Sequence, residues 1–489
     1  MGFRESRMGV VQNSTTVLVV EEHKQRPTYG TQYLAAFSAS MGAMAVGSVI
    51  GYSAPASAAF RWQNSTDNAT SEGFYLGKEE RSWFAGTMSI GALLGCMVAG
   101  YTIKTIGRKG TMLLSVIPLI IGWALIGLAQ NLAMLLCGRI LCGLCTGTTS
   151  LTVPTYTTEY ASKDIRGTLG SGFQLFITLG VLYAYVLGTV VESWRWLSVV
   201  CGALGLVYLL LAVFLRESPI YLLTKGEEEQ ARQSLQYFRG KSYDIEKELQ
   251  ELKDSLRESS DARLSLKDLS SPCVLKPLLT ILLLMFFQQL SGINAVVFNI
   301  NAIFQDSGSS ISEDASIIII GAVQVLSTVA STFLIDRAGR KLLLSLSAGV
   351  MAISITCMGV FFYEKEQDEE WVVSTLGWLP LTSLMVFCIS FCLGYGSVPW
   401  VMMGELFHPS VKAAASSMAA TFNWTCVFIV TFTFESLQEA IHVYGAFWFF
   451  GGICMINFIF CLTIVPETKG RTLQEITASF DSPVAKAVR

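Results

Sequence analysis

The chain has 489 residues, of which 52% are hydrophobic and only 15% are charged. Soluble domains usually carry about 25% charged residues, so this composition excludes an ordinary soluble protein and indicates a membrane protein. The formal net charge of −3 is too small to favour a nucleic acid as partner.

Apolar runs long enough to cross a bilayer as helices, about 20 residues each, recur along the chain. The twelve runs lie near 33–55, 83–103, 111–130, 132–153, 167–190, 194–215, 275–300, 311–335, 342–363, 378–403, 413–434 and 444–465. We therefore expect an all-α membrane protein with twelve transmembrane helices. Its expected parts are a tail at 1–32, six-helix halves at 33–215 and 275–465 separated by a segment at 216–274, and a tail at 466–489.

Lys and Arg are concentrated in alternate loops between these spans. The basic loops lie at 104–109, 163–166, 337–341, 412 and 469–471, and the loops nearly free of Lys and Arg at 130–131, 306–314, 364–370 and 435–442. The positive-inside rule predicts that the basic loops, and with them both termini, face the cytoplasm. The loop at 56–82 then lies outside the cell, where the acceptor motifs at Asn64 and Asn68 predict N-glycosylation.

The segment between the sixth and seventh spans is rich in charge. Its apolar residues recur at helical spacing, at Leu235, Phe238, Leu249, Leu252 and Leu256. This pattern predicts short amphipathic helices on the cytoplasmic surface, with a solvated linker as the alternative.

Short motifs recur at matching places in the two halves. IGRKG at 106–110 follows the second span and AGRKL at 338–342 follows the eighth. RESP at 216–219 ends the sixth span and PETKGR at 466–471 ends the twelfth. Two halves with shared motifs imply a pseudo-twofold arrangement with a binding site between them, near the middle of the membrane.

Together with VPTYTTE at 153–159, QQLSGIN at 288–294 and GYGSVPW at 394–400, these motifs resemble the signatures of the sugar porters of the major facilitator superfamily. GYSAP at 51–55 and FNW at 422–424 are most similar to insect facilitated trehalose transporters and their hexose-carrying relatives. The resemblance implies a plasma-membrane uniporter that carries trehalose, hexoses such as glucose, or both by alternating access, and that works as a monomer in the lipid bilayer. No metal cluster, nucleophile–base pair or phosphate-binding loop is evident in the sequence, so we expect no enzymatic activity and no cofactor.

Amide side chains interrupt the apolar stretch FFQQLSGINAVVFN at 286–299. An unpaired amide in hydrocarbon costs several kcal/mol, whereas Asn and Gln offer sugar hydroxyls both donors and acceptors without a net charge. We expect Ser291 and Gly292 to loosen this span so that its amides can line one cavity. The sugar-contacting residues implied by the resemblance are Gln174, Gln288, Gln289, Asn294, Gln324, Trp400 and Asn423. The alternatives are hydrogen bonds between helices for the amides and a place in the interfacial belt for Trp400, which would otherwise stack on the sugar ring.

The GYGSVPW stretch contains enough Gly and Pro to interrupt the tenth span. We interpret it as a hinge that closes part of this span over bound sugar, with a static kink as the alternative. The expected gating residues are Gly394, Gly396, Pro399 and Asn299. The sequence departs from many hexose carriers nearby: Asn299 stands in place of Tyr, Cys392 in place of Glu, and Val427 in place of an amide.

Charged residues also gather at the predicted cytoplasmic ends of the spans. The resemblance implies that they form a latch, which holds the cytoplasmic side shut while the carrier faces outward; the alternative is that they only anchor the topology. The expected latch residues are Arg108, Arg139, Glu159, Arg166, Glu217, Arg340, Glu405 and Glu467. Lys104 replaces an acidic residue of the family pattern and Ser410 a common Arg, so different partners are expected to contribute to the lock.

The first span contains no carboxylate, and Ser53 stands where proton-driven relatives carry one. No Asp or Glu lies in the middle of any predicted span, so the sequence shows no proton acceptor. This favours facilitated diffusion. The alternatives are a proton–sugar symporter and a non-transporting sugar sensor built on the same fold.

Overall fold

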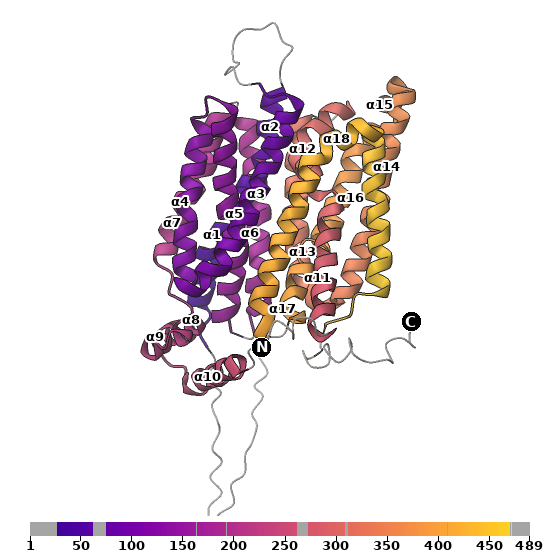
Figure 1. The fold of residues 1–489 in the computed structure, drawn as a ribbon. Helices are drawn as coiled ribbons and strands as arrows, with labels where there is room; N and C mark the ends of the chain where they lie inside the picture. The colour runs from indigo at the N-terminus through magenta and orange to yellow at the C-terminus, as the bar shows by residue number, and fades with distance from the viewer. Residues whose placement is uncertain are drawn as a thin grey trace, which may run out of the picture.

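The computed structural model describes residues 27–61, 75–162, 164–191, 193–261, 272–308, 312–407, 409–469 and 471. Within these residues every regular element is a helix (Figure 1). Eleven helical stretches are long and apolar enough to cross a membrane. The all-α membrane fold is therefore confirmed, whereas the acceptor residues Asn64 and Asn68 lie outside the described residues.

The first half of the chain forms one bundle. Its helices are α1 (Gly30–Gly51), α2 (Ser53–Arg61), α3 (Lys78–Thr105), α4 (Gly107–Gly127), α5 (Leu132–Tyr160), α6 (Arg166–Val190) and α7 (Trp194–Val213). Gly91 of α3 and Gly143 of α5 face each other so closely that a Cβ on either would strike the other helix's backbone, and Gly47 of α1 and Gly180 of α6 meet in the same way. Small residues at such contacts let membrane helices pack without a hydrophobic drive from lipid.

Three short helices follow: α8 (Pro219–Thr224), α9 (Glu228–Arg239) and α10 (Glu246–Asp261). Leu235, Ile245 and Leu249 form a small core between α9 and α10. Arg239 bonds to Glu248 at 2.6 Å and to the carbonyl of Tyr160, at the end of α5, at 2.8 Å. The segment is thus helical and docked on the first half rather than a solvated linker. We call the end of the bundle that carries α8–α10 the linker face.

The second half contains more interrupted spans. Its helices are α11 (Pro272–Leu290), α12 (Ile293–Ser307), α13 (Glu313–Ala338), α14 (Arg340–Gln367), α15 (Glu369–Leu376), α16 (Leu379–Leu393), α17 (Val398–Leu406) and α18 (Pro409–Thr463). We call the end that carries α15, opposite the linker face, the α15 face.

Helix α18 contains two spans. At 55 residues it would be about 80 Å long if straight, more than twice the hydrocarbon thickness. The backbone leaves the helical region at Ile441 and His442, where φ of His442 is +65°, and the second limb runs back toward the linker face (Figure 1). The eleven apolar stretches therefore supply the twelve expected spans.

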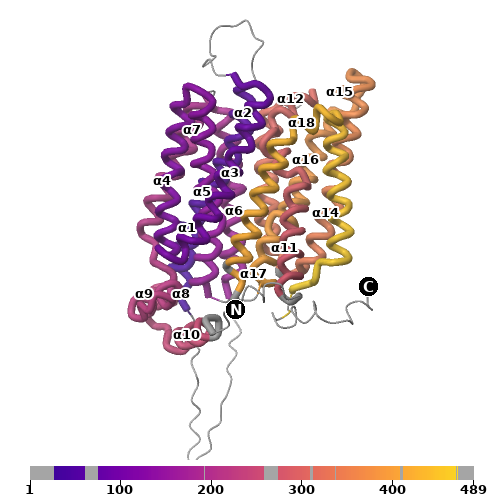
Figure 2. The backbone as a smooth tube through the Cα atoms, viewed as in Figure 1, coloured from indigo at the N-terminus to yellow at the C-terminus, as the bar shows by residue number. Residues whose placement is uncertain are grey.

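The two halves lie side by side, indigo to magenta against orange to yellow (Figures 1 and 2). The most extensive contacts between them are those of α3 with α18, α6 with α13, and α2 with α12. Any site between the halves is lined by these helices and by the interrupted spans next to them.

Candidate binding site and gates

The seventh span is broken where the sequence analysis expected it to loosen. Helix α11 ends at Leu290, and Gly292, with φ of +88°, begins the second helix α12. A Cβ at Gly292 would lie 2.8 Å from the ring of Phe450, so both its conformation and its surroundings require glycine. The break brings amides from α11 and α12 to the same level.

Four amide side chains meet at this break, and we call them the amide cluster: Gln288, Gln289, Asn294 and Asn423. Asn423 Nδ2, from α18, donates to Gln288 Oε1 at 2.9 Å, and Gln289 Nε2 donates to Asn423 Oδ1 at 3.2 Å. Asn294 Nδ2 donates to Gln289 Oε1. Gln288 Nε2 donates to the carbonyl oxygen of Tyr395, between α16 and α17, at 2.5 Å.

The hydrogen-bonding capacity of the cluster is unevenly used. The amide nitrogens of Gln289 and Asn423 each donate twice to neighbouring groups, so neither has a donor left. The nitrogens of Gln288 and Asn294 each donate once among the described residues, and Asn294 Oδ1 accepts no bond from them. Gln288 and Asn294 are therefore the two members with an N–H left for a hydroxyl ligand.

The other three expected sugar ligands lie apart from the bonds of this cluster. Gln324 is buried on α13 and donates to Cys388 Sγ at 3.5 Å. Gln174 is half-buried on α6, and Trp400 is half-buried on α17, where it packs against two buried hydrophobic clusters. Gln174 and Gln324 come from α6 and α13, which pack together at the interface, and contact of all three side chains with a sugar stays a prediction.

The tenth span is also interrupted, between α16 and α17. A Cβ on Gly394 would strike Ser347 of α14, so the end of α16 packs directly on α14. The N–H of Gly396 donates to the Phe391 carbonyl at 2.7 Å, and Pro399 lies in the first turn of α17. In α12, Asn299 leaves the helical region, with φ −116° and ψ +18°. These are the expected gating residues, and each lies at a backbone irregularity.

At the linker face the first half carries a compact charge network. Arg108 Nη2 donates to Glu159 Oε1 at 2.6 Å, and Ser218 donates to the other oxygen of the same carboxylate. Glu217 accepts the backbone N–H groups of Arg108 at 3.0 Å and Lys109 at 3.1 Å, at the start of α4. A carboxylate at a helix N-terminus is favoured by the free N–H groups and the helix dipole.

The second half repeats this network. Arg340 Nη2 donates to Glu405 Oε1 at 2.8 Å, and Thr468 donates to the second oxygen at 2.6 Å. Glu467 accepts the backbone N–H groups of Arg340 at 3.0 Å and Lys341 at 3.1 Å. Partial burial raises the pKa of the Glu467 carboxyl, but bonds from the surrounding N–H groups outweigh burial and hold the pKa below its ordinary value.

Both networks join helices within one half. Arg166, a further expected latch residue, donates to the Ala161 carbonyl at 3.3 Å. Across the described part of the chain, no ion pair joins the two halves at the linker face. A latch between the halves therefore stays a prediction for another conformation.

Arg139 does not belong to the linker face, so its assignment to the latch was wrong. It lies near the start of α5, about 30 Å along the helix from Glu159. The side chain is fully buried and donates to the carbonyls of Val49 at 3.1 Å and Phe84 at 3.3 Å, and to Ser53 Oγ at 2.6 Å. No carboxylate among the described residues pairs with it.

Ion pairs between the halves occur instead at the α15 face. Arg81 of α3 pairs with Glu435 of α18 at 3.3 Å, and Lys78 pairs with Glu439. The first pair is nearly buried, with side-chain exposures of 14% and 11%. The sequence analysis missed these pairs, although basic residues three apart and acidic residues four apart on helices are a recognisable sign of a charged seam.

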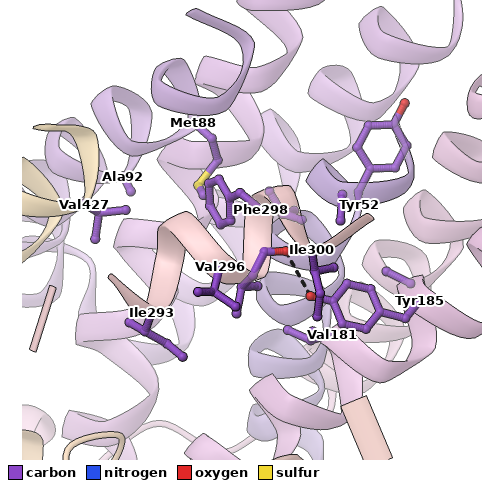
Figure 3. Close-up of a cluster of buried hydrophobic side chains, with 14 of the residues drawn as sticks. Tyr52, Met88, Ala92, Val181, Tyr185, Ile293, Val296, Phe298, Ile300 and Val427 are labelled. Atoms are coloured by element: carbon purple, nitrogen blue, oxygen red, sulfur yellow. Dashed lines mark hydrogen bonds between the residues drawn. The ribbon is translucent and has the colours of Figure 1, made fainter. Parts of the chain in front are cut away.

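Beneath these pairs the α15 end of the interface is apolar. Figure 3 shows Phe298 and Ile300 of α12 beside Met88 of α3 and Tyr185 of α6, within one buried cluster. The Tyr185 hydroxyl donates to the Val297 carbonyl at 3.0 Å, which ties α6 to α12. The two halves are therefore closed against each other at the α15 face.

Comparisons with known proteins agree with this architecture. A family model described as "Sugar (and other) transporter" matches residues 35–480. The facilitated trehalose transporter Tret1 of Polypedilum vanderplanki is 42% identical over 448 residues, covering 91% of this chain and 87% of that protein. The Tret1 protein of Anopheles gambiae is 41% identical over 450 residues, and the match covers 91% of this chain but only 55% of that protein.

A solved structure shares the fold. The proton:xylose symporter XylE of E. coli, bound to 6-bromo-6-deoxy-D-glucose, superposes with a TM-score of 0.76. The match is 23% identical and covers 92% of this chain and 99% of that one.

Proposed function

This chain belongs to the sugar transporter family and has the major facilitator fold, and on that premise we propose that it carries trehalose, hexoses such as glucose, or both by facilitated diffusion. It is a multi-pass membrane transporter rather than an enzyme. The named activity of its relatives supports trehalose as the first substrate to test.

The amide cluster is the observation that carries the proposal. A sugar presents hydroxyls, each both donor and acceptor, and the cluster offers neutral partners of both kinds in a buried place. Gln288 and Asn294 have free bonding capacity, so they bind the sugar directly. Gln289 donates to Gln288 and Asn423, and Asn423 donates to Gln288 and Met285, so the role of both is to brace the ligands. Gln174, Gln324 and Trp400 complete the site from the bordering helices.

Facilitated diffusion is supported by the surroundings of Arg139. A proton-coupled carrier needs a group that binds and releases a proton within the membrane. Here the buried guanidinium meets a hydroxyl, Ser53 Oγ, and backbone carbonyls. Among the described residues, no carboxylate lies beside this arginine to bind and release a proton.

The distribution of Lys and Arg supports a cytoplasmic linker face, with both termini inside and the α15 face outside, in the plasma membrane. In this orientation the halves are closed on the outside, and sugar would leave toward the cytoplasm. The interruptions at Gly394, Gly396, Pro399 and Asn299 are hinges for alternating access. Each chain holds a complete amide cluster, so a monomer suffices.

The test is uptake of labelled trehalose and labelled glucose into cells that express the full chain, with and without a protonophore. A Gln288→Ala variant removes a direct ligand. Gln305→Ala is the matched control, because this glutamine is exposed at the far end of α12. Surface biotinylation normalises each rate to the amount of protein at the cell surface.

Uptake of either sugar that survives the protonophore, collapses in Gln288→Ala and is retained in Gln305→Ala supports the proposal. Accumulation that disappears with the protonophore identifies a symporter. Surface-exposed protein that transports neither sugar contradicts the proposal and favours a sensor.

A further inference from the structure

Tyr395 occupies an unusual position in the interruption between α16 and α17. It is fully buried, its carbonyl oxygen accepts the Gln288 amide at 2.5 Å, and its N–H donates to Ser347 Oγ of α14 at 3.4 Å. Its hydroxyl donates to Asn457 Oδ1, on the second limb of α18. One residue thus connects the amide cluster to two other helices of the second half, α14 and the second limb of α18.

Asn457 is the less expected partner. It is fully buried, and its amide nitrogen meets no acceptor among the described residues. A side chain that served packing alone would be better apolar, because a buried amide with an unmade bond is unfavourable. The oxygen of Asn457, which receives the Tyr395 hydroxyl, is therefore the part of this side chain with a clear role.

We propose that Tyr395 and Asn457 are positioning residues, which orient the Gln288 amide for the sugar and tie it to the α16–α17 interruption. The inference rests on the proposed sugar-binding role of Gln288. Gln288 Nε2 carries two N–H groups; one is held by the Tyr395 carbonyl, and this fixes the direction of the other. The Tyr395 carbonyl is fixed in turn by the ring, whose hydroxyl Asn457 anchors.

The geometry also links binding to motion. The Tyr395 peptide lies between α16 and α17, so a movement of α17 turns the carbonyl that Gln288 contacts. A sugar bound to Gln288 is then most stable at one orientation of α17 relative to α16. Asn457 lies on a limb that contributes no member to the amide cluster, so its effect on the sugar passes through Tyr395.

The experiment measures the KM and the maximal rate of sugar uptake for Tyr395→Phe, Asn457→Leu and the double variant, each normalised to surface abundance. Tyr395→Phe removes only the hydroxyl, and Asn457→Leu keeps the branched outline of the side chain while removing its polar atoms. Cys461→Ala is the matched control, because Cys461 Sγ lies 3.1 Å from the same hydroxyl but is not needed to anchor it.

We expect each single variant to raise KM about three- to tenfold, the effect of one neutral hydrogen bond, with little change in maximal rate. The double variant should match the singles, because all remove the same bond, and Cys461→Ala should keep the KM of the unaltered chain. An unchanged KM, additive effects, or a loss explained by surface abundance alone would overturn the inference while leaving the proposed function standing. Absence of uptake by the unaltered chain would refute the proposed function and the positioning role together.

Discussion

Removing the Arg81–Glu435 pair is expected to open the α15 face. The two side chains are 14% and 11% exposed, and the Arg81 Nε–Glu435 Oε1 distance is 3.3 Å. Truncating one partner leaves the other charge poorly solvated in the closed state only, because opening the face returns it to water. A hydrogen bond to a charged group is worth about 1.5–3 kcal/mol, so Arg81→Ala or Glu435→Ala should raise the population open at the α15 face roughly 10- to 100-fold.

The assay is labelling of a cysteine placed between the halves. Val297 is buried beside Tyr185 in the closed interface, so a Val297→Cys side chain becomes accessible when the face opens. A membrane-impermeant thiol reagent added outside the cell reports this opening as a labelling rate. Cys137, which is exposed, is replaced by Ser in every variant to remove background.

Lys78 and Glu439 provide the matched control on the same two helices. Their side chains are 61% and 57% exposed, and exposed pairs contribute about 0–1 kcal/mol. Lys78→Ala should therefore change the labelling rate far less than Arg81→Ala, and the exchanged pair Arg81→Glu with Glu435→Arg should recover part of the closure. Equal labelling rates in the Arg81 and Lys78 variants would refute the reasoning.

Three further predictions concern coupling, backbone strain and the linker face. Ser53→Asp places a carboxylate beside Arg139, so sugar uptake should become dependent on external pH and sensitive to a protonophore. Uptake that stays independent of pH would contradict the view that the missing carboxylate is what prevents proton coupling. Gly292→Ala forces a side chain into a left-handed conformation, at about 1–2 kcal/mol, and should lower the melting temperature of the detergent-solubilised protein, whereas Gly452→Ala, with open space around it, should not. Glu159→Gln and Glu405→Gln should each reduce the maximal uptake rate several-fold and to a similar extent. Each variant removes the carboxylate partner of a partly buried arginine, and the two networks match. Uptake rates equal to those of the unaltered chain would mean that both residues only anchor the topology.

Span number and the break in the seventh span were predictable because each depends on a local property. The length of an apolar run is set by the thickness of hydrocarbon, and the Ser291-Gly292 step weakens a helix through its own backbone. Helix ends beyond the hydrocarbon were less predictable: α14 continues to Gln367 through residues that hydropathy assigns to a loop. Hydropathy reports where lipid ends, not where the helix ends.

The bonding within the amide cluster and the charged pairs were not predictable, because they depend on contacts between helices. That Gln288 and Asn294 interrupt an apolar span with polar groups is readable from the sequence, but which donors remain free depends on the packing of α18 against α11. The Arg81–Glu435 pair requires that α3 lie on α18, which no spacing within one span encodes. Arg139 was grouped with charged residues of the cytoplasmic span ends, although its place near the start of α5 puts it at the other end of the bundle.

The turn within α18 has a mechanical consequence. Only two non-helical residues, Ile441 and His442, connect the two limbs, so the connection is short. The first limb holds Glu435 at the seam with α3, and the second holds Asn457 behind Tyr395. Because the two limbs are so tightly joined, we expect them to move as one rigid body. A movement that separates α18 from α3 would then also shift Asn457, which anchors Tyr395 next to the amide cluster. We therefore expect separation of α3 from α18 at the α15 face and loosening of the amide cluster to occur together.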